Sequence, residues 1–302
     1  MFMYQPISRI LHSLLLLILI GTFGSMAYYI KTPPTPPNLP PATQPPTSMR
    51  TVVPTSSSSP VSRLPATVEP IPNTDWTRLQ PGLERRVIQI YDGQNGQVES
   101  IHIWRLDQKY FRMDVAFDAH PKSLENWQEE TDAAMVVNGG YFSIENERYS
   151  ADGLTILNGE AFGTSFAGFG GMLAIDRSKA ELRWLVEKPY NANERLQAAL
   201  QSFPILVAPG GELGFGAERD NHARARRTVI GQDKDGRILF IVAPQGYFTL
   251  HQLSVYLTES DLNLDIALNL DGGGSTGILV ENPQEIIPSK VLLPFVILVY
   301  PR

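Results

Sequence analysis

The sequence contains no cysteine and only five histidines in 302 residues. The lack of cysteine excludes disulfide bonds, thiolate metal sites and a cysteine nucleophile. The histidines are scattered and form neither an HExxH motif nor a His-x-His pair. We therefore predict no metal site and no cofactor. A hard cation held by aspartates stays an open alternative. Positive charge is also scarce, since 25 Lys and Arg stand against 31 Asp and Glu. This balance argues against nucleic acid as a partner, because such binding depends on phosphate neutralisation.

Glycine is absent between Lys31 and Asp75, and thirteen of the 24 prolines lie between Pro33 and Pro72. Serine and threonine supply most of the other side chains, so residues 32–75 have little to bury. We expect this segment to be a disordered tether, partly in the polyproline II conformation. Residues 76–302 are then left to form one well-packed domain.

Residues 10–30 form an almost purely apolar run, which is long enough to cross a bilayer at about 1.5 Å per residue. Arg9 precedes the run and Lys31 follows it. Two interpretations stay open for residues 1–31: a membrane anchor, or a signal peptide cleaved after Ser25-Met26-Ala27. Both interpretations place the domain in the cell envelope, outside the cytoplasm. Nothing in the composition indicates an oligomeric state.

Short β-branched runs dominate the chain after Trp76. We expect helices over 123–131, with Ser123 as N-cap, over 193–201, and over 249–259, with a capping box of Thr249 and Gln252. The expected strands cover residues 85–91, 101–106, 110–117, 133–137, 154–157, 172–175, 181–186, 205–208, 227–230, 237–243, 266–270, 276–280 and 291–300. This pattern predicts an α+β domain with a mixed or antiparallel β-sheet core.

The segment 266–280, IALNLDGGGSTGILV, matches two known patterns whose context is missing. A dinucleotide fingerprint needs a helix after its glycines, but Ile278-Leu279-Val280 is typical of a strand. A nucleophile elbow at Ser275 needs a histidine later in the chain, and the last one is His251. A convergent triad with His222 or His251 stays a minor alternative.

Asp271 ends a predicted buried strand and is followed by Gly272, Gly273 and Gly274. Successive glycines allow positive φ and let backbone N–H groups converge on an anion, to which Ser275 adds a hydroxyl donor. The alternative is a tight turn between strands, although one or two glycines would be enough for that. We therefore predict a functional site here.

Two further polar residues stand beside glycine, Asn138 at the end of a predicted strand and Asp152 at the end of a predicted loop. Asn138 is followed by Gly139-Gly140, and its amide suits a sugar hydroxyl; the alternative is a left-handed turn residue. Asp152 precedes Gly153 after a predicted loop over 145–150, and an ordinary Asp-Gly turn is the alternative there.

Three arginines concentrate in Ala223–Thr228, in an otherwise acidic domain. Arg226 and Arg227 face opposite sides if they lie on a strand. We expect Arg227 to point into a site, where its guanidinium would match phosphate oxygens; an exposed basic edge is the alternative.

Taken in order, VVNGGYF at 136–142, ADGLTI at 151–156, FPILV at 203–207, RRTVIG at 226–231 and ALNLDGGGSTGILV at 267–280 resemble the phosphodiester glycosidase family. The likeness covers most of residues 84–302. It implies hydrolysis between a sugar anomeric carbon and a phosphodiester. The resemblance makes Asp271 and Asp152 the candidate catalytic residues, and Asn138, Arg227, Gly272–Gly274 and Ser275 the candidate substrate-binding residues.

In a bacterial envelope the expected substrates are wall polymers, exported polysaccharides or nucleotide sugars. Two other hypotheses stay open: a non-catalytic glycan- or anion-binding module displayed on a membrane stalk, and an envelope scaffold protein.

Overall fold

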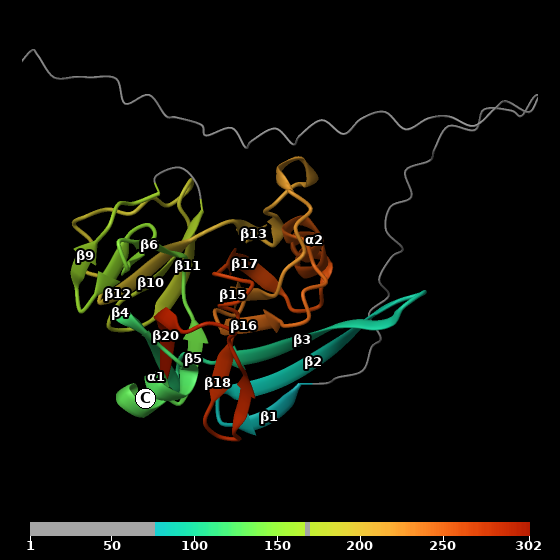
Figure 1. The fold of residues 1–302 in the computed structure, drawn as a ribbon, viewed down its shortest axis with the longest axis horizontal. Helices are drawn as coiled ribbons and strands as arrows, with labels where there is room; N and C mark the ends of the chain where they lie inside the picture. Colours follow the sequence, from blue (N-terminus) through green and yellow to red (C-terminus); the bar gives the residue numbers. More distant parts are fainter. Residues whose placement is uncertain (1–75, 167–169) are drawn as a thin grey trace, which may run out of the picture. The chain divides into compact units, whose positions relative to one another are not determined.

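The computed structural model describes residues 76–166 and 170–302, which form antiparallel sheets and two α-helices (Figure 1). The predicted apolar segment over 1–31 and the predicted tether over 32–75 lie outside the described residues. Within the described ranges, no helix is long and apolar enough to cross a membrane.

The largest sheet has eight strands in the order β1-β2-β3-β16-β15-β17-β13-β14. Every neighbouring pair in it is antiparallel. Its strands, in chain order, are β1 Thr77–Gln80, β2 Leu83–Asp92, β3 Gly96–Leu106, β13 Ile205–Ala208, β14 Glu212–Leu213, β15 Arg227–Asp233, β16 Ile238–Ala243 and β17 Leu264–Asn269. The central strands β15 and β16 are buried on both faces, as their nearly continuous apolar sequence requires.

Two five-stranded sheets and a separate hairpin complete the β structure. The first sheet, in the order β11-β10-β12-β8-β9, contains β8 Thr155–Leu157, β9 Glu160–Phe162, β10 Gly171–Ile175, β11 Ala180–Trp184 and β12 Ala198–Ser202. The second, in the order β19-β18-β5-β20-β4, contains β4 Phe111–Lys122, β5 Met135–Asn138, β18 Ile278–Val280, β19 Glu285–Ile287 and β20 Leu293–Pro301. The hairpin pairs β6 Phe142–Glu145 with β7 Arg148–Ala151.

Both helices begin at the caps that the sequence predicts. In α1 (Leu124–Thr131) the Ser123 hydroxyl accepts from the Asn126 N–H, and in α2 (Leu250–Glu259) Thr249 and Gln252 form a complete capping box. A 3₁₀ turn covers Ala217–Arg219.

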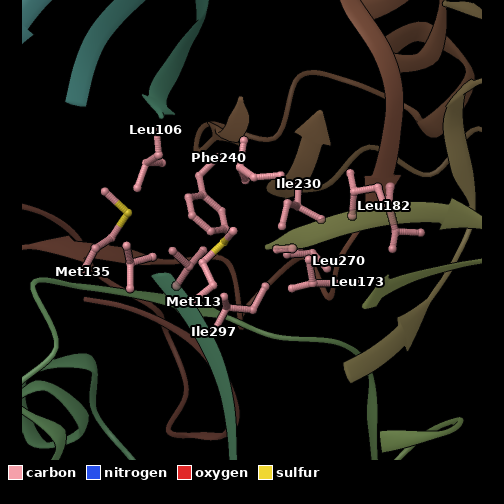
Figure 2. Close-up of a cluster of buried hydrophobic side chains, with 14 of the residues drawn as sticks. Leu106, Met113, Met135, Leu173, Leu182, Ile230, Phe240, Leu270 and Ile297 are labelled. Carbon is pink, nitrogen blue, oxygen red and sulfur yellow. The ribbon is translucent and has the colours of Figure 1, made fainter. Parts of the chain in front are cut away.

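One hydrophobic core joins the three large sheets (Figure 2). Phe240 of β16 faces Met113 of β4, while Leu173 of β10 extends the cluster toward the first five-stranded sheet. Leu270, which directly precedes Asp271, is fully buried in the same cluster. The candidate loop after β17 is therefore anchored by core packing.

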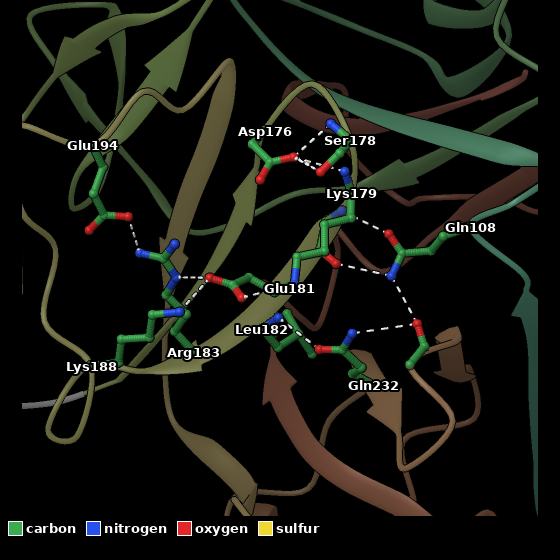
Figure 3. Close-up of polar contacts among 12 residues, drawn as sticks. Gln108, Asp176, Ser178, Lys179, Glu181, Leu182, Arg183, Lys188, Glu194 and Gln232 are labelled. Carbon is green, nitrogen blue, oxygen red and sulfur yellow. Dashed lines mark hydrogen bonds and ion pairs between the residues drawn. The ribbon is translucent and has the colours of Figure 1, made fainter.

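Polar side chains also tie the first five-stranded sheet to the eight-stranded sheet (Figure 3). The Gln108 side chain accepts from the Ala180 N–H and donates to the Gly236 carbonyl, and the Gln232 side chain accepts from the Leu182 N–H. Arg183 forms ion pairs with Glu181 and Glu194 at the outer side of β11. The Gln108 and Gln232 contacts fix the two sheets against each other.

The predicted α+β class is confirmed in its coarse form, because the described residues are mostly β-sheet with two helices. The helix predicted over 193–201 is wrong: residues 198–202 form β12, in which every residue is buried between β10 and β8. Residues 145–150, predicted as a loop, are mostly part of the β6–β7 hairpin. Tertiary pairing overrides helix propensity in the first case.

Candidate active site

Asn138 ends β5 and is almost fully buried, at 1% exposure. Its Nδ2 group donates to the Asp271 carbonyl at 2.7 Å and, more weakly, to the Gly139 carbonyl at 3.4 Å. Its Oδ1 atom accepts from the Thr228 hydroxyl at 2.7 Å and the Gly277 N–H at 3.0 Å. The amide thus has no capacity left for a substrate, and it joins the ends of β5, β15 and β17.

Asp271 follows β17 and lies beside the Asn138 motif, since its N–H donates to the Gly139 carbonyl at 3.1 Å. Its carboxyl accepts from the Gly272 N–H at 2.8 Å and interacts with the Ser275 hydroxyl. Burial raises the pKa of Asp271, the negative charge of Asp152 raises it further, and the two hydrogen bonds oppose this change. The carboxyls of Asp271 and Asp152 are therefore within electrostatic reach of each other.

Asp152 lies at the base of the β6–β7 hairpin. Its N–H donates to the Tyr141 carbonyl at 2.9 Å, and its Oδ1 accepts from the Ser143 hydroxyl at 2.6 Å. The carboxyl group is partly exposed, unlike the core residues that surround the strand ends. The hairpin therefore brings Asp152 back beside the NGGYF motif, and the charge of Asp152 acts on Asp271.

Tyr141 and Asn269 belong to the site although neither was predicted. The Asn269 Nδ2 group donates to the Tyr141 hydroxyl at 2.8 Å, and the Tyr141 ring stacks on Phe203 with centroids 4.5 Å apart. Burial raises the pKa of Tyr141 to about 12; the Asp271 charge adds to this, and the Arg227 guanidinium opposes it. The hydroxyl accepts the bond from Asn269, so its own proton is left to donate.

The signal for these two residues was present in the sequence. Tyr141 stands in NGGYF and Asn269 in ALNLDGGGS, both within the motifs that point to the site. A polar residue two positions before Asp271, inside an otherwise apolar strand, requires a buried hydrogen-bond partner.

Arg227 begins β15 and is 8% exposed. Its Nη2 group donates to the Ala223 carbonyl at 2.7 Å and its Nε group to the Phe248 carbonyl at 3.4 Å. Burial lowers the pKa of Arg227, whereas the nearby charge of Asp220 raises it. The backbone contacts occupy two corners of the guanidinium, and Nη1 is the corner left for an anion.

The Arg226 side chain is also buried, but its contacts are with other residues. Its Nη2 group donates to the Pro288 carbonyl at 2.9 Å, and its charge interacts with Glu99 rather than with Tyr141. The expectation that the two arginines face different sides agrees with these contacts.

The glycine loop differs from the predicted anion nest. Only Gly273 of the three glycines has positive φ, at 59°. The Gly272 N–H donates to the Asp271 carboxyl and the Gly273 N–H to the Arg226 carbonyl at 2.8 Å. The prediction that these N–H groups converge on a ligand is therefore wrong for Gly272 and Gly273, because the protein itself takes both donors. The loop orients Asp271 and Ser275 instead.

Residues 131–299, more than half of the chain, match the family model described as phosphodiester glycosidase. The chain belongs to this family. Every predicted site residue, from Asn138 to Ser275, lies inside the matched range. Family membership supports a glycosidase that acts on phosphodiesters in general.

Two solved structures share the fold. The catalytic domain of zebrafish N-acetylglucosamine-1-phosphodiester alpha-N-acetylglucosaminidase, auto-inhibited by its pro-peptide, aligns with a TM-score of 0.59 and 18% identity over 74% of this chain and 85% of that one. A hypothetical protein from Synechocystis aligns with a TM-score of 0.55 and 12% identity, over 76% of this chain and 64% of that chain, which is less than two thirds of its length. No curated protein matches the sequence.

No group of three or more acidic or histidine side chains in the described part of the family domain is arranged to hold a metal ion. The site contains two carboxyls, one guanidinium and one phenol. These groups are brought together from residues 141–152, the start of β15 and the end of β17.

Proposed function

We propose that this protein is an extracytoplasmic hydrolase that cleaves the bond between a sugar anomeric carbon and a phosphodiester. The proposal is supported by the interaction of the Asp152 charge with Asp271, and by the interaction of Tyr141 with both Asp271 and Arg227. Most glycosidases use two carboxyl groups that flank the reacting sugar carbon. A guanidinium can donate two parallel hydrogen bonds to phosphate oxygens.

The chemistry requires little acid assistance, because a phosphodiester is a weakly basic leaving group. Positive charge accumulates at the anomeric carbon in the transition state, and a carboxylate near that carbon stabilises it. We assign this position to Asp271, which the Gly272 N–H and the Ser275 hydroxyl orient. Asp152 is the second carboxyl, at the partly exposed side from which water enters.

Arg227 stabilises the negative charge that develops on the departing phosphate. Its fixed Nε and Nη2 groups leave Nη1 for a phosphate oxygen, and the low exposure of the side chain strengthens that interaction. Tyr141 is positioned to donate its proton to an oxygen of the substrate. Asn138 positions Asp271 through the hydrogen bond from its side-chain amide to the Asp271 carbonyl.

The proposal extends to location, since the apolar segment 10–30 and the proline-rich segment 32–75 favour export and membrane attachment. Wall polymers, exported polysaccharides and nucleotide sugars contain the required linkage. The natural substrate is then a phosphodiester of one of these classes, outside the cytoplasm.

The test is release of free sugar by the full-length protein from a panel of sugar-1-phosphodiesters that includes a UDP-sugar. We expect turnover of at least one member by the wild type and a loss of at least about 100-fold in Asp271→Asn. The matched control is Asp114→Asn, because burial also raises the pKa of Asp114 but this residue lies on β4, outside the site.

A non-catalytic binding module would give a different result. It would bind an intact phosphosugar and raise the melting temperature without releasing sugar. Binding without turnover across the panel, by correctly folded protein, contradicts the hydrolase proposal.

A further inference from the structure

A fully buried carboxylate on β3 has no role in the reaction proposed above. Glu99 is 0% exposed, although a carboxylate is rarely buried unless its charge is compensated. It also lies outside residues 131–299, which match the family model. The β2–β3 pairing is irregular at this point, because it passes from Glu99 to Gln97 and skips Val98. A bulge of this kind changes the direction of a side chain.

Four backbone N–H groups donate to the Glu99 carboxylate. Its Oε1 atom accepts from the Ser100 N–H at 3.0 Å and the Gln245 N–H at 2.9 Å. Its Oε2 atom accepts from the Gly246 N–H at 2.9 Å and the Tyr247 N–H at 3.1 Å. The Gln245 side chain adds a further bond, because it accepts from the Ser100 N–H at 2.9 Å. The carboxylate therefore fixes the segment between β16 and α2.

This segment, residues 244–248, is in contact with the chain that leads into Arg227. The Phe248 carbonyl accepts from the Arg227 Nε group and from the Ala225 N–H, both at 3.4 Å. The strand register explains the contact, since Arg227 pairs with Ala243, the last residue of β16. The segment that Glu99 holds therefore supplies one of the two backbone partners of the Arg227 guanidinium.

The segment also lies against the main chain of Arg226. Gly246 has a φ of 84°, and an added Cβ atom there would lie 3.3 Å from the Arg226 nitrogen. The negative charge of Glu99 acts on Arg226 as well, since it raises the pKa of this arginine while burial lowers it. Glu99 thus stabilises both the segment and the buried residue that precedes Arg227.

We propose that Glu99 is a positioning residue for Arg227, and that it sets the affinity of the site for the phosphate of the substrate. The inference rests on the proposed function, which assigns the phosphate to Arg227. Glu99 acts through the N–H groups of residues 245–247, and the next residue, Phe248, holds the Arg227 Nε group. Loss of the carboxylate shifts this carbonyl and leaves the guanidinium with one backbone partner fewer.

The test is the Glu99→Gln variant of the full-length protein, titrated calorimetrically with inorganic phosphate. The amide replaces one carboxylate oxygen by an NH₂ group, so two of the four backbone donors lose their acceptor. We expect the phosphate affinity to fall by about 10-fold. On a sugar-1-phosphodiester, kcat/KM should fall by about 10- to 100-fold. Glu99→Asp, which keeps the charge, should lie between this variant and the wild type.

Asp233 provides the matched control, because it is another buried carboxylate that accepts from backbone N–H groups. It lies at the opposite end of β15 from Arg227, where it accepts from the Asp235 and Arg237 N–H groups at 3.1 and 2.9 Å. Asp233→Asn should lower the stability, as Glu99→Gln does, and leave the phosphate affinity unchanged. An equal loss of phosphate affinity in the two variants overturns the proposal.

A milder variant keeps the proposal testable if Glu99→Gln does not fold. Gln245→Ala removes only the side-chain bond to the Ser100 N–H, and it should weaken phosphate binding by about two- to ten-fold. Arg227→Lys keeps a positive charge but cannot form both backbone bonds of the guanidinium. In that background Gln245→Ala should cause no further loss, whereas equal losses in both backgrounds overturn the proposal.

Phosphate binding separates this inference from the proposed reaction. If the phosphate affinity depends on Glu99 but no sugar is released, only the hydrolase proposal fails. If the wild type binds no phosphate, or if Arg227→Lys binds it as tightly as the wild type does, the positioning role of Glu99 is overturned whether or not sugar is released.

Discussion

The side-chain amide of Asn138 donates a hydrogen bond to the main-chain carbonyl of Asp271 at 2.7 Å, across 133 residues of sequence. A second hydrogen bond joins the same two segments, because the Asp271 N–H donates to the Gly139 carbonyl. Both bonds use the backbone of Asp271, so the Asp271 carboxyl is left for the reaction. Asn138 is in this view a positioning residue and not a substrate ligand.

We expect Asn138→Ala to destabilise the protein by about 2–4 kcal/mol, because it leaves the Asp271 carbonyl, the Gly277 N–H and the Thr228 hydroxyl without their buried partner. Thr228→Val removes only one of these bonds and should cost about 1 kcal/mol. Chemical denaturation of the full-length variants measures both. Unchanged stability of Asn138→Ala, together with a raised KM, would show instead that the amide contacts the substrate.

The strand ends were predictable because each carries its own local signal. Asn138 and Asp271 stand next to glycine after apolar runs, and the ends of such runs gather where strands end together. Asp152 stands next to glycine after a predicted loop. The caps at Ser123 and Thr249 were predictable for the same reason, since a capping bond involves residues only three positions apart.

The rest depends on contacts between residues far apart in the sequence. The segment that becomes β12 reads as a helix because Ala, Leu and Gln favour helices, and only the pairing with β10 and β8 makes it a strand. The three glycines were expected to bind an anion, but the Arg226 carbonyl, which no local pattern places there, takes the Gly273 N–H. The partnership of Tyr141 with Asn269 is likewise tertiary.

The glycine loop should tolerate a methyl group at one glycine and not at another. A Cβ atom on Gly272 would lie 2.8 Å from the Arg226 carbonyl oxygen, which belongs to the backbone and has no room to move. On Gly274 the nearest atom is Val291 Cγ1 at 3.2 Å, at the tip of an exposed side chain.

We therefore expect Gly272→Ala to lower the free energy of unfolding by about 1–3 kcal/mol and to reduce activity, whereas Gly274→Ala changes the stability by less than about 1 kcal/mol. Thermal denaturation and sugar release, measured side by side, test the pair. A larger loss of stability in Gly274→Ala than in Gly272→Ala would contradict this account of the loop.

The pH dependence of activity should report the interaction between the two carboxyls. Burial raises the pKa of Asp271 above 3.8, and the charge of Asp152 adds to this. If the ionised form of Asp271 is the active one, kcat/KM falls as the pH drops through this raised pKa. Removal of the Asp152 charge should move that acidic limb to lower pH.

The measurement is the pH profile of kcat/KM for Asp152→Asn and the wild type. Asp152→Asn is expected to lose activity, so the position of the limb, and not the rate, is the informative quantity. Asp114→Asn serves as the control, with an unshifted limb. A limb that does not move in Asp152→Asn would mean that Asp271 does not govern it.

The ion pair between Arg85 and Glu285 joins the eight-stranded sheet to the second five-stranded sheet, and it should make folding sensitive to acid. Burial alone would raise the pKa of Glu285, but the hydrogen bonds from Arg85 and His102 lower it to about 2. The Arg85 Nε group donates to Glu285 at 2.8 Å, and its guanidinium lies 4.1 Å from the centroid of the Trp104 ring. The folded state thus favours the ionised carboxylate more strongly than the unfolded state does.

The stabilisation by Glu285 is fully present above its unfolded pKa of 4.5 and is lost as the pH falls toward 2. Glu285 is 32% exposed, so solvent screening reduces the contribution to about 1–2 kcal/mol at neutral pH. Glu285→Gln should be less stable than the wild type by this amount at pH 7, and the difference should shrink as the pH falls below 4.5. The exposed Glu281→Gln is the control and should follow the wild type, as measured by urea denaturation between pH 2 and 7. A stability difference that stays constant over this range would mean that the Glu285 charge does not stabilise the junction of the two sheets.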